Sequence, residues 1–301
     1  MSNLHANFDE TSNELRAHKM KKDKRVKTWD QLLAALYNIP KTHHQRYRSN
    51  FVYRGVANKE WGLETSLKRL GPAYLDVERP LIRNFAKYAQ PGEIPSTALW
   101  FRLAVAQHHG LPTRLIDWTV SPRVAAHFAT FEEEHYDKDG AIWAVDVVKA
   151  IDYLPSEFQT MLKEESAFLF SIEMLDRLMS SLSHFDALSK KGEFVLFFEP
   201  PSLDARIINQ GAVMSVMPGA NLDLRGFLTE RAPANLYHRI IIPKRLKWEI
   251  RDKLDQDNVT ERMLFPGLDG LSRWLKRYYG PGPTVKPSAH KKLPSSGRGL
   301  P

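Results

Sequence analysis

The segment 99–129 constrains the fold more than any other part of the chain, because its pattern changes from helix to strand and back to helix without a long connection. Residues 99–107 are apolar enough for a packed helix, and Gly110 followed by Pro112 is a typical helix end. Residues 113–118 alternate between apolar and polar side chains as a short strand does. The pattern therefore predicts a helix, a tight turn and a strand.

A second helix is predicted to begin soon after this strand. The side chain of Ser121 can cap a helix N-terminus, and Pro122 is well tolerated in a first helical turn. Polar side chains lie at the junctions of these elements, with Gln107, His108 and His109 in the last turn of the first helix. We therefore expect the function of the chain to depend on this segment.

The other predicted elements do not alternate regularly. An entry helix begins at Thr28, which forms a possible capping box with Gln31. Strands are predicted at 51–55, 141–148, 192–200, 205–217 and 235–243, and further helices at 244–256 and 270–280. A doubly wound sheet needs regular alternation of strands and helices, so the pattern predicts a single α+β domain with a mixed, mostly antiparallel sheet flanked by helices.

The net charge of +8 comes mainly from the two ends of the chain. Residues 1–27 carry seven Lys/Arg against four Asp/Glu, and residues 281–301 carry four against none. We interpret 1–27 as a basic tail that is disordered or partly helical, and 281–301 as a disordered basic tail rich in Pro, Gly and Ser. They flank one domain at 28–280. The alternative is that the tails make a weak electrostatic contact with nucleic acid or an acidic partner.

Composition also limits the compartment and the chemistry. The chain has no cysteine, which excludes disulfides, thiolate metal clusters and cysteine nucleophiles and suits a reducing cytosol. It contains neither an apolar run long enough to span a bilayer nor a signal-peptide pattern. We therefore expect a cytoplasmic protein that does not bind a membrane.

Several common sites do not fit the sequence. The patterns of a P-loop, a dinucleotide-binding glycine loop and a nucleophile elbow do not occur in it. His108 and His109 are adjacent, so their side chains would diverge by about 100° on a helix and are poorly placed to share a zinc ion. The acidic stretch 132–140 is interpreted as a solvated helix end and loop. We therefore expect no metal site.

One charged residue on a predicted strand is unusual. Arg54 ends the strand FVYRG beside Gly55, at a position where a further apolar residue would be expected. A guanidinium can hold a phosphate or carboxylate through two hydrogen bonds, and the missing side chain at Gly55 would let a ligand approach. The alternative is structural, because Arg54 or Arg114 could form a buried ion pair with Asp117 that braces the fold.

These residues belong to a series of motifs that resembles the FRG-domain family of bacteria and phages. The motifs are YRG at 53–55, W-x-L-x-x-S-L-x-R at 61–69, AQHHGLPTRLIDWTVSP at 106–122, RIINQG at 206–211 and LFPGLDGL at 264–271. The resemblance covers about residues 28–280. The sequence departs from the family at Glu64-Thr65, where a proline tends to precede Ser-Leu, and at Gln210-Gly211, where a residue is often inserted.

The order of these motifs also resembles that of ADP-ribosyltransferases. The resemblance implies a split sheet, NAD as a substrate, and a strand that ends in Asp117-Trp118-Thr119 before a helix. The implied catalytic residues are Gln210, Asp117 and His109. The implied NAD-binding residues are Tyr53, Arg54, Gly55, Gln107, His108, Thr113, Arg114, Trp118 and Thr119.

The resemblance also implies a role for some of these side chains. Arg54 would anchor a phosphate or ribose, and Trp118 or Tyr53 would offer a stacking face. Gln210 stands where the family of enzymes usually has a carboxylate. An amide is no general base at neutral pH, so Gln210 would bond a ribose hydroxyl, and Asp117 or a histidine would take the base role.

Three functions remain open at this point. The first is an ADP-ribosyltransferase-like enzyme that acts as a toxin or antiphage effector, with a nucleotide ligand and with nucleic acid or an antitoxin as partner. The second is a non-catalytic nucleotide-binding or interaction module, and the third is a nuclease or other hydrolase that uses the His-His-Asp cluster. The first requires Arg54, the turn 107–109, Asp117 and Gln210 to meet in one cleft.

Overall fold

The computed structural model describes residues 23–37, 46–233 and 235–282 of the 301-residue chain. The strands are β1 (Asp23–Arg25), β2 (Phe51–Val56), β3 (Ile116–Thr119), β4 (Gly140–Asp146), β5 (Leu196–Phe198), β6 (Ala212–Val216) and β7 (Tyr237–Ile242). They form one sheet in the order β1-β7-β4-β2-β3-β6-β5. Strand β1 runs parallel to β7, and the other neighbouring pairs are antiparallel. The predicted mixed, mostly antiparallel α+β fold is confirmed.

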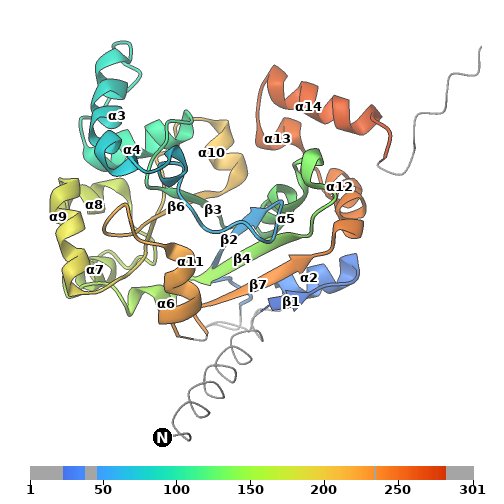
Figure 1. The fold of residues 1–301 in the computed structure, drawn as a ribbon, viewed down its shortest axis with the longest axis horizontal. Helices are drawn as coiled ribbons and strands as arrows, with labels where there is room; N and C mark the ends of the chain where they lie inside the picture. Colours follow the sequence, from blue (N-terminus) through green and yellow to red (C-terminus); the bar gives the residue numbers. More distant parts are fainter. Residues whose placement is uncertain (1–22, 38–45, 234, 283–301) are drawn as a thin grey trace, which may run out of the picture.

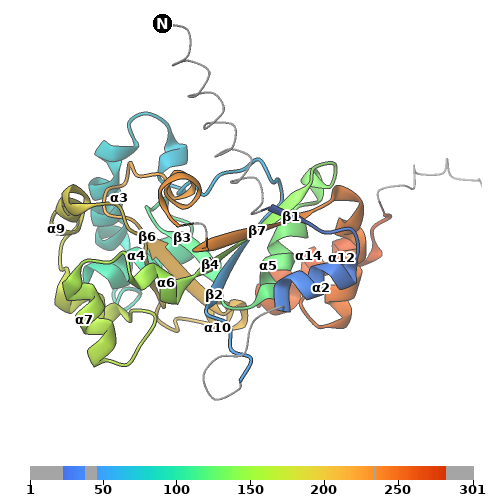
Figure 2. The ribbon, with the colours of Figure 1, turned by 90° about the horizontal axis from the view of Figure 1, so that it is seen from below.

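Helices gather in two groups on either side of this sheet (Figure 1, Figure 2). The first group comprises α2 (Trp29–Tyr37), α5 (Pro122–Thr130), α12 (Lys247–Gln256), α13 (Glu261–Leu264) and α14 (Leu268–Tyr279). The second comprises α3 (Tyr74–Tyr88), α4 (Leu99–His108), α7 (Ser156–Glu164), α8 (Ile172–Leu178) and α9 (Leu182–Ala187), which surround β5 and β6. The short helices α6 (Val147–Ile151), α10 (Ala205–Gln210) and α11 (Leu224–Gly226) lie near the middle of the molecule.

The segment that constrains the fold most forms the predicted elements. Helix α4 ends at His108, and Gly110 follows it with a φ of 83°, a backbone conformation that glycine adopts without strain. Helix α5 begins after Ser121, whose hydroxyl accepts a hydrogen bond from the backbone N–H of Val124 at 3.4 Å. The sequence pattern therefore located the helix and the capped helix correctly, whereas the strand predicted at 113–118 begins only at Ile116.

Gly55 has a different role from the predicted one. A Cβ atom at Gly55 would lie 1.9 Å from the carbonyl oxygen of Ala125 and 2.6 Å from the amide nitrogen of Ala129, both in α5. Helix α5 therefore packs directly on the backbone of β2, and its small residues Ala125 and Ala129 permit this close approach. The missing side chain makes room for a helix, which corrects the expectation that it makes room for a ligand.

The predicted strand at 205–217 is wrong in its first half. Asp204 caps α10 by accepting hydrogen bonds from the backbone of Arg206 and Ile207. Gly211 then adopts the left-handed conformation with a φ of 53°, and β6 begins at Ala212. A cap at one end and a glycine stop at the other outweigh the strand propensity of the two isoleucines in between.

The sheet begins earlier than the predicted domain boundary at Thr28. Asp23 of β1 lies opposite Arg239 of β7, and its carboxylate also accepts hydrogen bonds from that guanidinium. The rest of the two predicted tails, 1–22 and 283–301, lies outside the described residues. Within the described part of the chain, no helix is both long enough and apolar enough to cross a membrane.

A buried group of charges fixes α13 and α14 to the body of the molecule. We call it the ionic cluster, and it consists of His127, Arg251, Glu261 and Arg277. Glu261 accepts hydrogen bonds from Arg251 at 3.1 Å and from Arg277 at 2.7 Å. Arg251 also lies 2.6 Å from Nδ1 of His127 in α5. The cluster therefore joins the three consecutive helices α12, α13 and α14 to α5, which is far from them in sequence.

Candidate functional site

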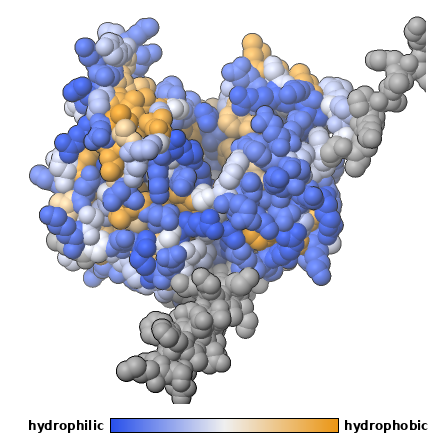
Figure 3. Space-filling view, viewed as in Figure 1, coloured by the Kyte–Doolittle hydropathy of each residue, from blue (hydrophilic) through white to orange (hydrophobic). Residues whose placement is uncertain are grey.

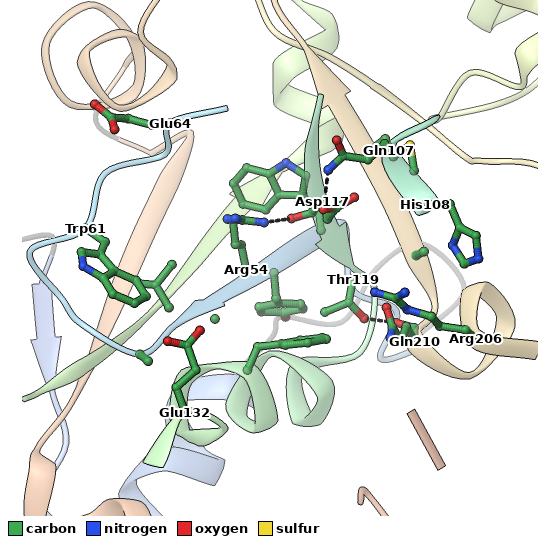
Figure 4. A pocket seen from close by; sticks show the side chains of 18 of the residues that line it. Arg54, Trp61, Glu64, Gln107, His108, Asp117, Thr119, Glu132, Arg206 and Gln210 are labelled. Carbon is green, nitrogen blue, oxygen red and sulfur yellow. Dashed lines mark hydrogen bonds between the residues drawn. The ribbon is translucent and has the colours of Figure 1, made fainter. Parts of the chain in front are cut away.

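The sheet opens between β2 and β3. These two strands pair only at Tyr53 and Thr119, whereas β2 pairs with β4 along its whole length and β3 pairs with β6 along its whole length. Beyond the single pair, β2 and β3 diverge, as Figure 4 shows. The backbones of residues 54–56 and 116–118 are therefore not joined by a ladder, and their side chains border an opening in the sheet.

A cavity of about 510 Å³ lies at this opening. Its volume is within the range of pockets that bind small molecules and nucleotides. Arg54, Gln107, His108, Asp117, Trp118, Thr119 and Gln210 line it, together with Tyr53 and Gly55. The structure thus brings together residues that are spread from β2 to α10, as the convergence expected from the sequence requires.

Arg54 crosses the opening between the two strands. Its Nη1 donates a hydrogen bond of 2.6 Å to the backbone carbonyl of Asp117. Its Nε is buried and has no hydrogen-bond partner among the described residues. Burial lowers the pKa of Arg54, and this effect outweighs the opposing influence of the Asp117 carboxylate. The guanidinium therefore lines the cavity with unused hydrogen-bonding capacity.

Asp117 is held by a chain of two side chains. The hydroxyl of Thr113 donates to Oε1 of Gln107 at 2.6 Å, and Nε2 of Gln107 donates to Oδ2 of Asp117 at 2.7 Å. Thr113 fixes the orientation of the Gln107 amide, which then directs its NH₂ group at the carboxylate. Gln107 is therefore a positioning residue for Asp117, and both polar atoms of its amide are engaged.

The two neighbouring histidines are placed differently. His108 lines the cavity and lies 2.7 Å from Oδ2 of Asp204, the residue that caps α10. Burial opposes ionisation of Asp204, but hydrogen bonds from the Ile207 backbone and from His108 hold its pKa below the ordinary range. His109 is exposed, is not among the residues that line the cavity, and contacts the ring of His108 edge-on at 5.1 Å.

Gln210 reaches the cavity, but its amide nitrogen is already bonded. Nε2 donates to the backbone carbonyl of Leu264 at 2.9 Å, at the end of α13. Its own backbone carbonyl accepts a hydrogen bond of 2.5 Å from the hydroxyl of Thr119. Gln210 therefore ties α10 to β3 and α13, and only its side-chain oxygen remains without a described partner.

The two aromatic residues expected to stack on a ligand are largely enclosed. Trp118 is 3% exposed, and its indole N–H donates to the hydroxyl of Ser215 at 2.8 Å. Tyr53 is 1% exposed and packs on the α5 side of the sheet, where its hydroxyl lies 3.1 Å from that of Ser49. Both side chains therefore contribute mainly to the core beneath the cavity.

Arg114 lies outside the cavity. Its guanidinium makes paired hydrogen bonds to Glu78 in α3 and also contacts the carboxylate of Asp186 in α9. The ion pairs of Asp117 with Arg114 or with Arg54, which were the structural alternative, do not form, because Arg114 has these two acidic partners and Arg54 bonds a carbonyl. Arg114 is thus a structural residue that joins α3, α9 and the turn before β3.

Five further side chains of the cavity were not singled out by the sequence analysis. Trp61, Glu64, Arg69, Glu132 and Arg206 all line it. Trp61 and Arg69 belong to the motif at 61–69, and Arg206 begins the motif at 206–211, so the motifs themselves contained this information. Glu132 begins the acidic stretch that was interpreted as solvated. The composition of this stretch does not distinguish Glu132 from its neighbours.

A buried lysine holds the two loops that carry Trp61 and Glu132. The ammonium group of Lys247 donates hydrogen bonds to the backbone carbonyls of Ala57 at 2.6 Å and His135 at 2.7 Å. Burial lowers the pKa of Lys247 to about 8. This wall of the cavity is therefore attached to α12 through one fully buried side chain.

Charge is divided between the two ends of the cavity. Figure 4 shows Trp61 and Glu132 on one side, Arg206, Gln210 and His108 on the other, and Arg54 with Asp117 between them. An anionic group would be favoured near the arginines, and a cationic or polar group near Glu132. Within the described residues, no group of His, Asp and Glu side chains is arranged to hold a metal ion.

The comparisons with known proteins agree with the motifs. A family model for the FRG domain matches residues 49–138, which include β2, β3 and α5 and thus two of the three strands around the cavity. No curated protein and no solved structure is similar enough to add a second comparison. The match therefore shows an FRG domain at residues 49–138 of this chain.

Proposed function

We propose that the protein is an ADP-ribosyltransferase-like enzyme that uses NAD as its substrate. One observation carries this proposal. The motif positions Arg54, Asp117–Thr119 and Gln210 lie on or directly before β2, β3 and β6, which are neighbours in the sheet. All of these positions line one cavity at the split between β2 and β3. This is the spatial arrangement that the resemblance to ADP-ribosyltransferases implied.

The residues of the cavity fit the parts of NAD. The guanidinium of Arg54, which lines the cavity without a carboxylate partner, and that of Arg206 suit the pyrophosphate, because arginine recognises phosphate through charge-assisted hydrogen bonds. Trp61 is 38% exposed and offers the accessible aromatic face that Trp118 and Tyr53 lack. The carboxylate of Glu132 beside Trp61 suits the positive charge of the nicotinamide ring.

Asp117 is the best-positioned carboxylate for the chemistry. In the proposed reaction, the bond between the ribose and nicotinamide breaks with both electrons leaving on nicotinamide, and a nucleophile of the acceptor bonds to the resulting oxocarbenium-like carbon. The acceptor proton passes to Asp117, whose orientation Gln107 and Thr113 fix. Gln210 accepts a hydrogen bond from a ribose hydroxyl through its free oxygen.

A non-catalytic nucleotide-binding module is the second candidate, because the amide of Gln210 occupies the position of the usual carboxylate and bonds Leu264. The hydrolase hypothesis has less support, since His109 lies outside the cavity and His108 bonds Asp204. A role as a toxin or antiphage effector, with nucleic acid or protein as acceptor, belongs to the first candidate.

Incubation of the purified chain with adenine-labelled NAD and a total cell lysate tests the proposal. We expect release of nicotinamide and transfer of label to a macromolecule, which nuclease and protease digestion would identify as nucleic acid or protein. Arg54→Gln and Asp117→Asn should each lower NAD turnover at least 100-fold, while Arg177→Gln, a surface change at a salt bridge with Glu165, should not. NAD binding without turnover would favour the binding module, and no binding at all would contradict both candidates.

A further inference from the structure

The side chains of Asn209 and Gln210 both bond the end of α13. Nδ2 of Asn209 donates to the backbone carbonyl of Met263 at 2.7 Å, and Nε2 of Gln210 donates to that of Leu264 at 2.9 Å. Met263 and Leu264 are the last two residues of α13, so their carbonyls have no partner within the helix. We call these two contacts the amide clasp. Two consecutive side chains of α10 thus satisfy two carbonyls at the end of another helix.

Helix α10 is held at both of its ends. At its start, the carboxylate of Asp204 lies 2.7 Å from Nε2 of His108 in α4. At its end, the amide clasp reaches α13. Figure 1 shows α10 between α4 and α13, and Figure 3 shows the molecular surface hollowed between the two groups of helices to which these belong. Gln210 is therefore held between the two groups, at a place where it lines the cavity.

The end of α13 cannot adapt to α10, because α13 has anchors of its own. The hydroxyl of Thr260 caps the helix by accepting a hydrogen bond from the backbone N–H of Met263 at 3.3 Å. Glu261 belongs to the ionic cluster and bonds two buried arginines. A Cβ atom at Gly270 of α14 would lie 1.8 Å from the carbonyl oxygen of Phe265, so α14 packs tightly on the residue that follows α13. The side chains of α10 must therefore match carbonyls whose positions are fixed.

These fixed carbonyls determine how Gln210 presents its amide. A carbonyl oxygen only accepts hydrogen bonds, so the NH₂ group of Gln210 must face Leu264, and the amide oxygen is the atom left for a ligand. The backbone of Gln210 is fixed from the other side, because its carbonyl accepts a hydrogen bond from the hydroxyl of Thr119 in β3. Turning the amide around would break its bond to Leu264.

We propose that Asn209 is a positioning residue for Gln210, and that the end of α13 requires a side chain that donates a hydrogen bond at position 210. The site then operates with an amide and not with a carboxylate at this position. An ionised carboxylate would direct an oxygen at the carbonyl of Leu264 with no proton between the two atoms. The part of Gln210 in binding a ribose hydroxyl rests on the proposed function, whereas the requirement for a donor rests on the clasp alone.

The first test does not involve NAD and compares Gln210→Glu with the wild-type chain by urea denaturation. At about pH 8 the new carboxylate is ionised, so we expect a lower urea midpoint than in the wild type. The difference should narrow toward about pH 5, because the protonated carboxyl regains a donor for Leu264 and the folded chain then binds a proton that the unfolded chain does not.

A nearby arginine makes the opposite result equally visible. Figure 4 shows Arg206 beside Gln210, and its positive charge would favour an anion at position 210. If the carboxylate of Gln210→Glu bonds Arg206 instead of facing Leu264, the difference in midpoint from the wild type stays constant or widens toward low pH. That result would show that position 210 accepts a carboxylate and would overturn the proposal.

The second test measures the effect of Asn209 on NAD binding by calorimetry. Asn209→Ala removes half of the clasp and should raise the dissociation constant about three- to tenfold, the effect of one lost hydrogen bond. Asn209→Asp should also weaken binding at about pH 8 and recover in part toward about pH 5, when its carboxyl can again donate to Met263, whereas Asn209→Ala should show no such recovery.

Gln159→Glu is the matched control. Gln159 in α7 donates to the backbone carbonyl of Leu154 at 2.8 Å, as Gln210 does to Leu264, but it does not line the cavity. The control should lose stability with the same dependence on pH and leave the NAD dissociation constant unchanged.

The two proposals fail in different ways. Unchanged NAD affinity in Asn209→Ala would contradict the positioning role of Asn209, and faster NAD turnover in Gln210→Glu would contradict the requirement for an amide. A wild-type chain that does not bind NAD would contradict the proposed function, and the urea measurements would still decide which side chain position 210 accepts.

Discussion

Two regions of this molecule hold arginines away from bulk water, and they differ in how those arginines are paired. In the ionic cluster, Arg251 and Arg277 share the carboxylate of Glu261, and Asp255 adds a second acceptor for Arg277. In the cavity, the described partner of Arg54 is one backbone carbonyl and not a carboxylate. A buried Nε without a described partner is common to Arg54 and Arg251 and does not separate the two regions. The nearest carboxylate, that of Asp117, accepts its hydrogen bond from Gln107.

The difference separates a structural arginine from one that can bind a ligand. A buried guanidinium that bonds a carboxylate already has its charge balanced, and removing that partner leaves an uncompensated charge. A guanidinium with free donors in a cavity stabilises the fold less and retains its capacity for an anionic ligand. Arg114, which bonds Glu78 and Asp186, belongs to the structural type although it lies in the same motif as Asp117.

The largest effect that this comparison predicts is on the ionic cluster. Glu261→Gln removes the negative charge between two buried arginines, so we expect the free energy of unfolding to fall by about 3–5 kcal/mol. Urea denaturation of the full chain measures this loss. Glu249→Gln, which breaks an exposed pair with Lys253 at 3.0 Å, is the control and should cost about 0.5 kcal/mol or less. A loss below about 1 kcal/mol for Glu261→Gln would show that the cluster does not brace the helices.

The sequence predicted the elements around the cavity better than the partners of its side chains. The cap at Ser121, the strand of Arg54 and the convergence of Gln107, Asp117 and Gln210 follow from local patterns and motif order. The partner of Arg114 could not be predicted, because Glu78 and Asp186 are far from it in sequence and many acidic residues were equally eligible. A residue contact of this kind depends on the tertiary structure alone.

Two further errors have local physical reasons. Gly55 was assigned to ligand approach because a glycine next to Arg54 fits that role, but the close packing of α5 on β2 uses the space. Glu132 was grouped with its solvated neighbours because the acidic composition of a stretch does not show where any one of its side chains points. Lys247 holds the loop that carries Glu132 through a hydrogen bond to the backbone of His135, and it holds the neighbouring loop through a hydrogen bond to Ala57.

The ionic cluster should also make stability depend on pH. Burial lowers the pKa of His127 well below its ordinary value of about 6.5, and the positive charge of Arg251 adds to this effect. Below pH 6.5 the unfolded chain binds a proton at His127 that the folded chain does not, so stability falls with decreasing pH by up to about 1.4 kcal/mol per pH unit. His238, whose pKa burial and Lys24 also lower, contributes in the same direction.

Urea denaturation between pH 6.5 and pH 5 separates these histidines from the carboxylates, which titrate near pH 4 when unfolded. His127→Gln should reduce the slope of stability against pH by about one proton, because glutamine can accept the hydrogen bond from Arg251 without titrating. An unchanged slope would show that His127 becomes protonated in the folded protein.

The smallest expected change in stability is at the cavity, and it distinguishes the two kinds of arginine most directly. Arg54→Gln removes a cation whose pKa burial already lowers and whose described side-chain bond is to one carbonyl, so we expect the free energy of unfolding to change by less than about 1 kcal/mol. Arg114→Gln leaves the carboxylate of Glu78 buried without its cation and should cost about 3 kcal/mol or more.

Both variants are compared by urea denaturation under the same conditions, with NAD binding measured by calorimetry on each. Arg54→Gln should lose NAD binding and keep its stability, whereas a loss of stability as large as that of Arg114→Gln would make Arg54 a structural residue and remove the proposed anchor of the site.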